Sequence, residues 1–136
     1  MTEEKFEELK TKLTKDLDVN KSNILLKSIE TPKMYSYYLN FYSKELKYYK
    51  DLLLLKETTY GELFDYYKFD YEKKLDKKSE IEPFIKSNKK YNKVLIKCNN
   101  QEMYVTWLEH TLKNINQISF NIKNYIEYQK FINGEH

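Results

Sequence analysis

The sequence predicts a mainly α protein built from long helices. Only two Gly and two Pro occur among 136 residues, so few positions interrupt a helix. Most apolar residues recur at helical spacing rather than in the alternation typical of strands. The length is that of one domain, and an aromatic content of 16% is too high for a disordered chain. We therefore predict a single helical domain over 1–136.

Two helices are expected in the first 78 residues. In 1–30, apolar residues at helical spacing follow a glutamate-rich first turn, which predicts a short amphipathic helix and a linker. Thr31 and Pro32 are typical of a helix start, because Thr accepts a bond from a free backbone N–H and Pro needs no donor at the first position. A long helix is expected over 32–78. Its apolar stripe comprises Tyr35, Tyr38, Leu39, Tyr42, Leu46, Tyr49, Leu53 and Tyr60.

The helical pattern breaks after this segment. Pro83 and a polar run at 87–90 interrupt the spacing, so we predict a connector over 79–100. A brief alternation within 93–97 allows one short β segment there.

The last segment, 101–133, contains neither Gly nor Pro and predicts one long helix, with Gly134 at a position common for a C-terminal cap. Its apolar residues repeat in heptads, which is typical of a coiled-coil seam. We therefore predict that this helix assembles the protein into an oligomer, and that replacing Ile115 and Ile122 by Asp yields monomers. The predicted oligomerisation residues are Tyr104, Leu108, Ile115, Ile118, Ile122, Tyr125 and Ile132.

Catalytic and metal-binding signatures are absent from the sequence. It has no Gly-rich phosphate loop or nucleophile elbow, and two His and one Cys are too few for the usual metal sites. We predict that the protein is not an enzyme and needs no metal or cofactor. The single Cys98 fits a reducing cytosol, and no apolar run approaches the ~20 residues that span a membrane.

Lysines are concentrated in the middle of the chain. The net charge is only +3, but 61–100 carries ten Lys against seven acids, and 83–101 has no acid. Such a run predicts contacts with a phosphate backbone, although a solvated lysine-rich surface accounts for the residue types equally well. The candidates are Lys68, Lys73, Lys74, Lys77, Lys78, Lys86, Lys89, Lys90, Lys93 and Lys97.

Tyrosines away from the apolar stripe are candidates for stacking on exposed bases. Most of the 14 Tyr are expected in the core, whereas Tyr37, Tyr48 and Tyr67 fall off the stripe. Of these, Tyr67 is included in the predicted nucleic-acid site.

Four segments in order resemble the UvsY recombination mediators of large tailed phages. They are residues 34–40 (MYSYYLN), 63–67 (LFDYY), 79–81 (SEI) and 120–123 (FNIK). The similarity runs from about Met34 to Gly134, with one short deletion after Tyr67, and the order and spacing of the segments carry it.

The resemblance implies a helical subunit that assembles into a closed heptameric ring through its C-terminal helix. It implies binding to single-stranded DNA, to a UvsX-like recombinase and to the phage single-strand-binding protein, in the cytoplasm of the infected bacterial host. It also implies a Lys and an Arg before the Asp-Tyr-Tyr element, but Gly61 and Leu63 stand there. Lys56, Lys68, Lys73 and Lys74 are the nearest substitutes.

The hypothesis from the sequence is a recombination mediator that helps to load a RecA-like recombinase by displacing the single-strand-binding protein. A non-enzymatic coiled-coil adaptor that binds only proteins is the alternative, favoured by the low net charge and the missing basic pair. A small phage enzyme or inhibitor is disfavoured, because no nucleophile, base and metal ligand can be brought together.

Overall fold

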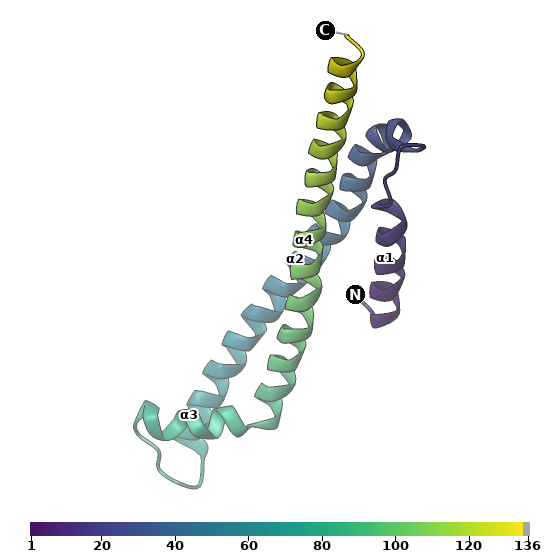
Figure 1. Ribbon diagram of the computed structural model, residues 1–136. Helices are drawn as coiled ribbons and strands as arrows, with labels where there is room; N and C mark the ends of the chain where they lie inside the picture. The colour runs from purple at the N-terminus through teal and green to yellow at the C-terminus, as the bar shows by residue number, and fades with distance from the viewer. Residues whose placement is uncertain (135–136) are drawn as a thin grey trace. The chain divides into compact units, whose positions relative to one another are not determined.

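The computed structural model describes residues 1–134, which contain four α-helices and one π-helical turn (Figure 1). Over these residues there is no strand, and the predicted mainly α class is confirmed. The elements are α1 (Glu3–Asp16), α2 (Ile24–Asp65), η1 (Tyr66–Asp70), α3 (Lys78–Ser87) and α4 (Lys89–Ile132).

The chain divides into two compact units, and both long helices contribute to each of them. Unit 1 consists of Met1–Lys44 and the chain from Tyr104 onward, so it holds α1, the first half of α2 and the C-terminal part of α4. Unit 2 is Glu45–Met103, with the second half of α2, η1, α3 and the start of α4.

Unit 1 is held together by a core to which three helices contribute. Phe6 of α1 makes edge-to-face ring contacts with Tyr104 and Trp107 of α4, at centroid distances of 4.9 and 5.2 Å. Such contacts stabilise beyond the apolar area they bury. The buried members of the core are Leu9, Met34, Tyr38, Leu108, Leu112 and Ile115.

A buried tyrosine ties α1 to α2. The Tyr38 hydroxyl donates to Asp16 Oδ2 at 3.0 Å, and Lys12 Nζ lies 2.6 Å from the same oxygen. Burial, and then the nearby Asp16 carboxylate, raises the pKa of Tyr38, so the hydroxyl stays protonated and donates. The end of α1 is thereby fixed to α2.

We expect Tyr38→Phe to lower the free energy of unfolding by about 1.5 kcal/mol, because it removes one hydrogen bond to a charged acceptor. Lys12 still pairs with Asp16, so the carboxylate is not left alone. Urea unfolding followed by circular dichroism measures the change. Tyr48→Phe, at an exposed position of α2, is the matched control and should be neutral; equal midpoints for the two variants would contradict the proposed role of the hydroxyl.

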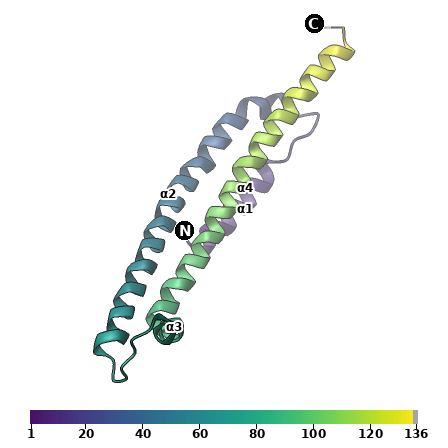
Figure 2. The same ribbon diagram turned by 90° about the vertical axis from the view of Figure 1, so that its left-hand side faces the viewer.

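Unit 2 pairs the second half of α2 with the first turns of α4, and α3 lies across their ends (Figures 1 and 2). Between the long helices, Leu52 packs with Val94 and Cys98, and the Cys98 thiol donates to the Leu52 carbonyl at 3.4 Å. A second cluster joins η1 to α3. Its buried members are Tyr67, Leu75, Ile81 and Ile85.

The second helix begins at Ile24, not at Pro32 as predicted. An asparagine turn starts it, since the Asn20 side chain accepts from the backbone N–H groups of Ser22 and Asn23 at 2.9 and 3.1 Å. Pro32 lies inside the helix, where it cannot donate to the preceding turn. The helix nevertheless continues through Pro32 without this hydrogen bond.

The same helix ends at Asp65 rather than near 78. The chain changes to the wider π geometry over Tyr66–Asp70, and Tyr71 is extended (φ −76°, ψ 148°). Tyr67, Tyr71 and Leu75, which follow this point, pack against residues of α3. Burial of these side chains therefore outweighs the helical propensity of 66–78.

The predicted connector over 79–100 is helical apart from Asn88. Asn88 is extended (φ −72°, ψ 131°), and its side chain accepts from the N–H groups of Lys90 and Tyr91 at 2.9 and 3.3 Å. It is thus the N-terminal cap of α4. The β segment allowed at 93–97 lies within α4, because its alternation is too short to outweigh this capped start.

The C-terminal end matches the sequence more closely. Helix α4 ends at Ile132, and Gly134 has a positive φ of 73° with its N–H donating to the Phe131 carbonyl at 3.2 Å. Glycine adopts this conformation without the steric cost of a Cβ atom. The predicted cap is confirmed, whereas the helix starts twelve residues earlier than the expected boundary at 101.

Candidate nucleic-acid interface

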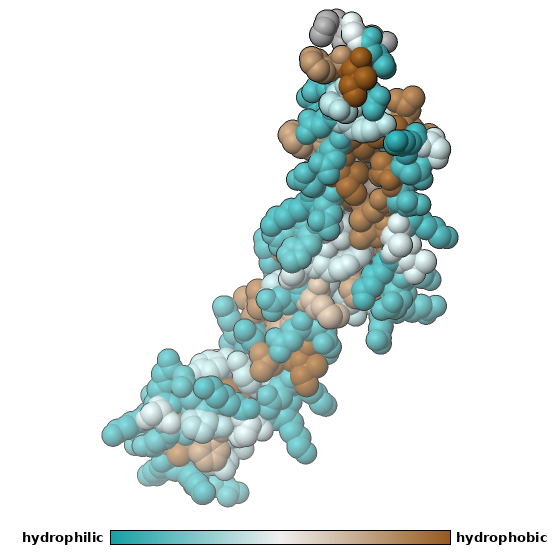
Figure 3. Space-filling model, in the orientation of Figure 1, coloured by the Kyte–Doolittle hydropathy of each residue, from teal (hydrophilic) through white to brown (hydrophobic). Residues whose placement is uncertain are grey.

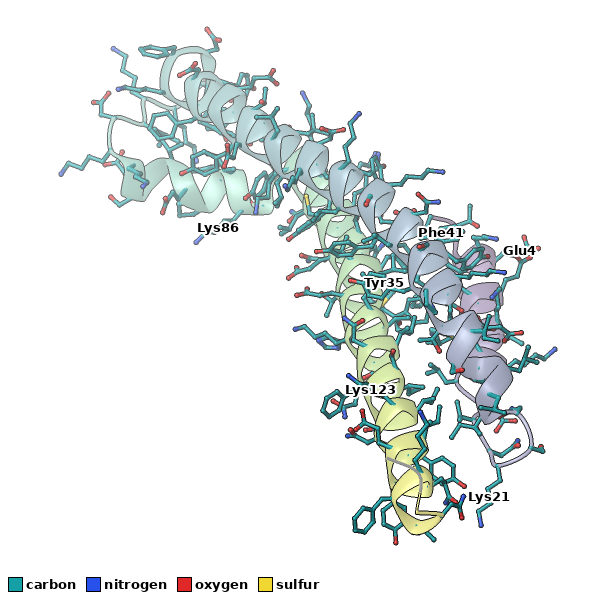
Figure 4. The ribbon with its side chains drawn as sticks, turned by 90° about the horizontal axis from the view of Figure 1, so that it is seen from above. Glu4, Lys21, Tyr35, Phe41, Lys86 and Lys123 are labelled. Carbon is teal, nitrogen blue, oxygen red and sulfur yellow. The ribbon has the colours of Figure 1, made fainter. Side chains whose placement is uncertain are left out.

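A row of exposed lysines runs from the end of α3 along the first turns of α4. We call Lys86, Lys89, Lys93 and Lys97 the lysine face. The three on α4 are four residues apart, and at 100° per residue they fall within about 80° of one side of the helix. Figure 4 shows the Lys86 side chain projecting away from α3.

The junction between α3 and α4 fixes the lysine face. Asn92 Nδ2 donates to the Lys86 carbonyl at 3.0 Å, which keeps the end of α3 beside the first turn of α4. Asn88 Nδ2 donates to the Tyr67 hydroxyl at 3.0 Å and links the same junction to η1. The lysines therefore project from a defined backbone.

The charges of the lysine face are not neutralised by neighbouring acids. Among the described residues, none of its four ammonium groups has a carboxylate within ion-pair distance, and 83–101 contains no acid. By contrast, Lys90 lies 3.4 Å from Glu62 and Lys78 lies 3.6 Å from Glu82. Uncompensated ammonium groups are the ones that attract phosphate most strongly.

The predicted lysines around η1 stand in a different environment. Lys68, Lys73, Lys74 and Lys77 are exposed, but 65–80 contains five acids against five lysines. Lys56 is half-buried on α2. The structure thus separates the candidate lysines into an acid-free group and a charge-balanced group, a division that residue type alone does not reveal.

Tyr67 does not offer the stacking surface that the sequence predicted. The residue is 8% exposed, and its ring packs against Tyr71 and Phe84 at centroid distances of 5.1 and 5.5 Å. No base can lie on a ring covered in this way. The exposed aromatic residues of η1 are its neighbours Tyr66 and Phe69, which sequence reasoning missed because it assigned the whole segment to one α-helix.

A hydrogen bond between α2 and α3 supports this region. The Tyr60 hydroxyl donates to Glu82 Oε1 at 3.1 Å. Desolvation, and then this bond, raises the pKa of Tyr60, so the phenol remains a donor at neutral pH. Leu63, one of the two positions where the basic pair is missing, packs against the same cluster around α3.

Some of the predicted oligomerisation residues are buried within unit 1, whereas others are accessible. Leu108, Ile115 and Ile122 are buried within the subunit, and Tyr104 packs on Phe6. The three buried side chains are not accessible to another subunit, which corrects that part of the prediction. The remaining three are half-buried or exposed: Ile118, Tyr125 and Ile132.

Other apolar side chains of unit 1 do face solvent. Phe120 and Tyr128 are both 60% exposed on α4, and hydrophobic residues gather along the C-terminal part of this helix in Figure 3. A groove of 290 Å³ opens on a different side of α4 from Tyr128. It is lined by Ser28, Ser119, Ile122, Lys123, Ile126, Glu127 and Lys130.

Residues 1–134 hold neither a metal-binding cluster nor a membrane-spanning helix. No group of three or more His, Cys, Asp or Glu side chains is placed to hold a metal ion there. None of the helices in that range has the length and apolarity needed to cross a membrane.

Comparison with known proteins identifies the family. Residues 12–135 match the family model described as "Recombination, repair and ssDNA binding protein UvsY". The chain belongs to the UvsY family. No curated protein sequence matches it.

Solved structures of a UvsY protein share the fold. A crystal structure of the bacteriophage T4 recombination mediator protein UvsY (lattice type II) has a TM-score of 0.78 and 22% identity, covering 92% of this chain and 95% of that one. The lattice type IV structure of the same protein has a TM-score of 0.77 and 21% identity, covering 92% of this chain and 96% of that one. The lattice type I structure has a TM-score of 0.77 and 21% identity, covering 91% of this chain and 98% of that one. At these identities the likeness extends to the UvsY fold, while the residues that bind ligands must be argued from this chain.

Proposed function

We propose that this UvsY-family protein is a recombination mediator that binds single-stranded DNA and helps to load a RecA-like recombinase. The observation that carries the proposal is the lysine face, four uncompensated ammonium groups in a segment free of acids. Backbone phosphates are its natural ligand, and such contacts are independent of base sequence.

Family membership supports the remaining parts of the proposal. Bound to single-stranded DNA, the protein displaces the phage single-strand-binding protein and admits a UvsX-like recombinase, in the cytoplasm of an infected bacterium. It acts without catalysis, metal or cofactor, since its task is to change which protein occupies the strand.

Assembly strengthens a weak individual site. We propose a homo-oligomer, a heptameric ring, in which each subunit contributes one lysine face. Four lysines bind a strand weakly, but linked copies raise the overall affinity by about 10²–10⁴ without any new kind of contact. The modest net charge of +3 per chain is therefore compatible with tight binding.

The test is a triple substitution on α4, Lys89→Gln, Lys93→Gln and Lys97→Gln, measured by fluorescence anisotropy with an oligothymidine strand over a salt series. We expect weaker binding and a shallower dependence of log K on log salt, by about 0.7 for each phosphate that the variant no longer neutralises.

The matched control replaces Lys21, Lys33 and Lys44, three exposed lysines of unit 1, by Gln. It removes the same charge and should leave the salt slope almost unchanged. Equal losses of affinity in the two variants would mean that net charge, rather than the lysine face, attracts the strand. A wild-type oligomer indifferent to DNA at low salt would instead favour the protein-only adaptor.

A further inference from the structure

Two aromatic side chains are exposed on η1, beside a third that is buried. Phe69 is 71% exposed, the highest value among the large hydrophobic residues that the structure describes, and Tyr66 is 45% exposed. Tyr67, between them in the chain, is a core residue. The π-helical turn therefore carries a buried aromatic residue between two exposed ones, and such turns recur at functional sites.

Tyr66 is held rigidly although it faces solvent. Its ring lies 5.1 Å from the ring of Tyr67 and 6.1 Å from that of Tyr71, both edge-on. Tyr71 rests in turn on Phe84 of α3 at 5.4 Å. A ring supported in this way loses little conformational entropy when a ligand packs on it.

Phe69 combines an exposed ring with a nearby cation. Lys68 Nζ lies 5.5 Å from the centroid of the Phe69 ring, and both side chains are exposed. An exposed ring with an ammonium group over it offers an aromatic surface and a positive charge, which match the two parts of a nucleotide, a flat base and a phosphate. Asp70 and Glu72 stand nearby, so charge alone gives η1 little attraction for DNA, and the ring must supply the selectivity.

We propose that Phe69, with Tyr66 beside it, stacks on the bases of a bound strand and gives the protein its preference for single-stranded over double-stranded DNA. This inference rests on the proposed function, since the lysine face supplies the phosphate contacts. In a duplex both faces of each base are covered by neighbouring pairs, whereas an unpaired strand exposes them to a protein ring.

Substitutions at position 69 separate the ring from its apolar bulk. Phe69→Leu keeps the bulk without the flat face, and Phe69→Tyr keeps the face. Leu54→Ala, at another exposed apolar position of unit 2, is the control for loss of apolar surface. Each variant is titrated with oligothymidine, with a duplex, and with an equally long strand of abasic residues. Circular dichroism and light scattering check fold and assembly.

We expect Phe69→Leu to weaken binding to oligothymidine by about 5- to 150-fold, while Phe69→Tyr and Leu54→Ala bind like the wild type. The salt slope should stay unchanged, because no charge is altered. On the abasic strand, wild type and Phe69→Leu should bind equally.

Three results would overturn the inference. If Phe69→Leu binds oligothymidine as the wild type does, stacking is absent, while the salt-dependent binding of the wild type still supports the proposed function. If the variant loses as much affinity on the abasic strand, the ring acts on something other than bases. If the wild type does not bind single-stranded DNA at low salt, both the inference and the proposed function fail.

Discussion

Replacing Ile115 by Asp is expected to unfold unit 1 rather than to release folded monomers. The side chain is 1% exposed and belongs to the core formed by α1, α2 and α4. A carboxylate there has no cationic partner, and burying it costs more than a typical domain can lose from a total stability of roughly 5–15 kcal/mol. Circular dichroism should show a large loss of helix, and most of the protein should be insoluble or protease-sensitive.

The matched control is Ile132→Asp, the same chemical change on the same helix. Ile132 is 56% exposed, so its carboxylate remains hydrated and the subunit should keep its helix content and melting temperature. If Ile115→Asp gave a folded monomer with a native thermal transition, the heptad seam predicted from the sequence would be right and the buried position of Ile115 wrong.

Local capping signals predicted the end of α4 but not the starts of α2 and α4. Gly134 ends the last helix as expected, because a residue without a Cβ atom adopts a positive φ at little steric cost. Asn88, which begins α4, is an equally local signal, but the polar run around it was interpreted as a connector. The heptad repeat was real in the sequence, yet a subunit core and an intersubunit seam require the same apolar spacing, so periodicity does not distinguish them.

The sequence predicted which segment carries the candidate lysines, but not which aromatic side chains near it are exposed. The absence of acids over 83–101 located the lysine face without any structure. Tyr67, in contrast, was predicted to be exposed and is buried, whereas its neighbour Phe69 is exposed. The chain leaves α-helical geometry at Tyr66, which changes the direction of the side chains that follow. The change is driven by burial against α3, a contact distant in sequence that the local pattern does not encode.

Charged substitutions on the exposed face of α4 should disrupt assembly and leave the subunit folded. Phe120 and Tyr128 are eight residues apart, which puts them within about 80° of each other on the helix, and both are largely exposed in unit 1. Large apolar side chains grouped on a surface are typical of protein–protein contacts. Since the predicted seam is partly buried, this face is where we propose that another subunit packs. Asp at both positions places two carboxylates in that contact.

For Phe120→Asp with Tyr128→Asp we expect native helix content, a small particle by light scattering, and affinity for a long oligothymidine strand lowered by about 10²-fold or more. Nearly all of the loss should come from multivalency, so binding to a strand short enough for one subunit should change little. Lys113→Gln with Lys123→Gln shifts the charge of the same helix by the same two units and should remain assembled. If the Asp variant and the control both remain assembled, subunits associate through another surface. If the Asp variant dissociates but keeps full affinity for long strands, linked lysine faces are not the cause of tight binding.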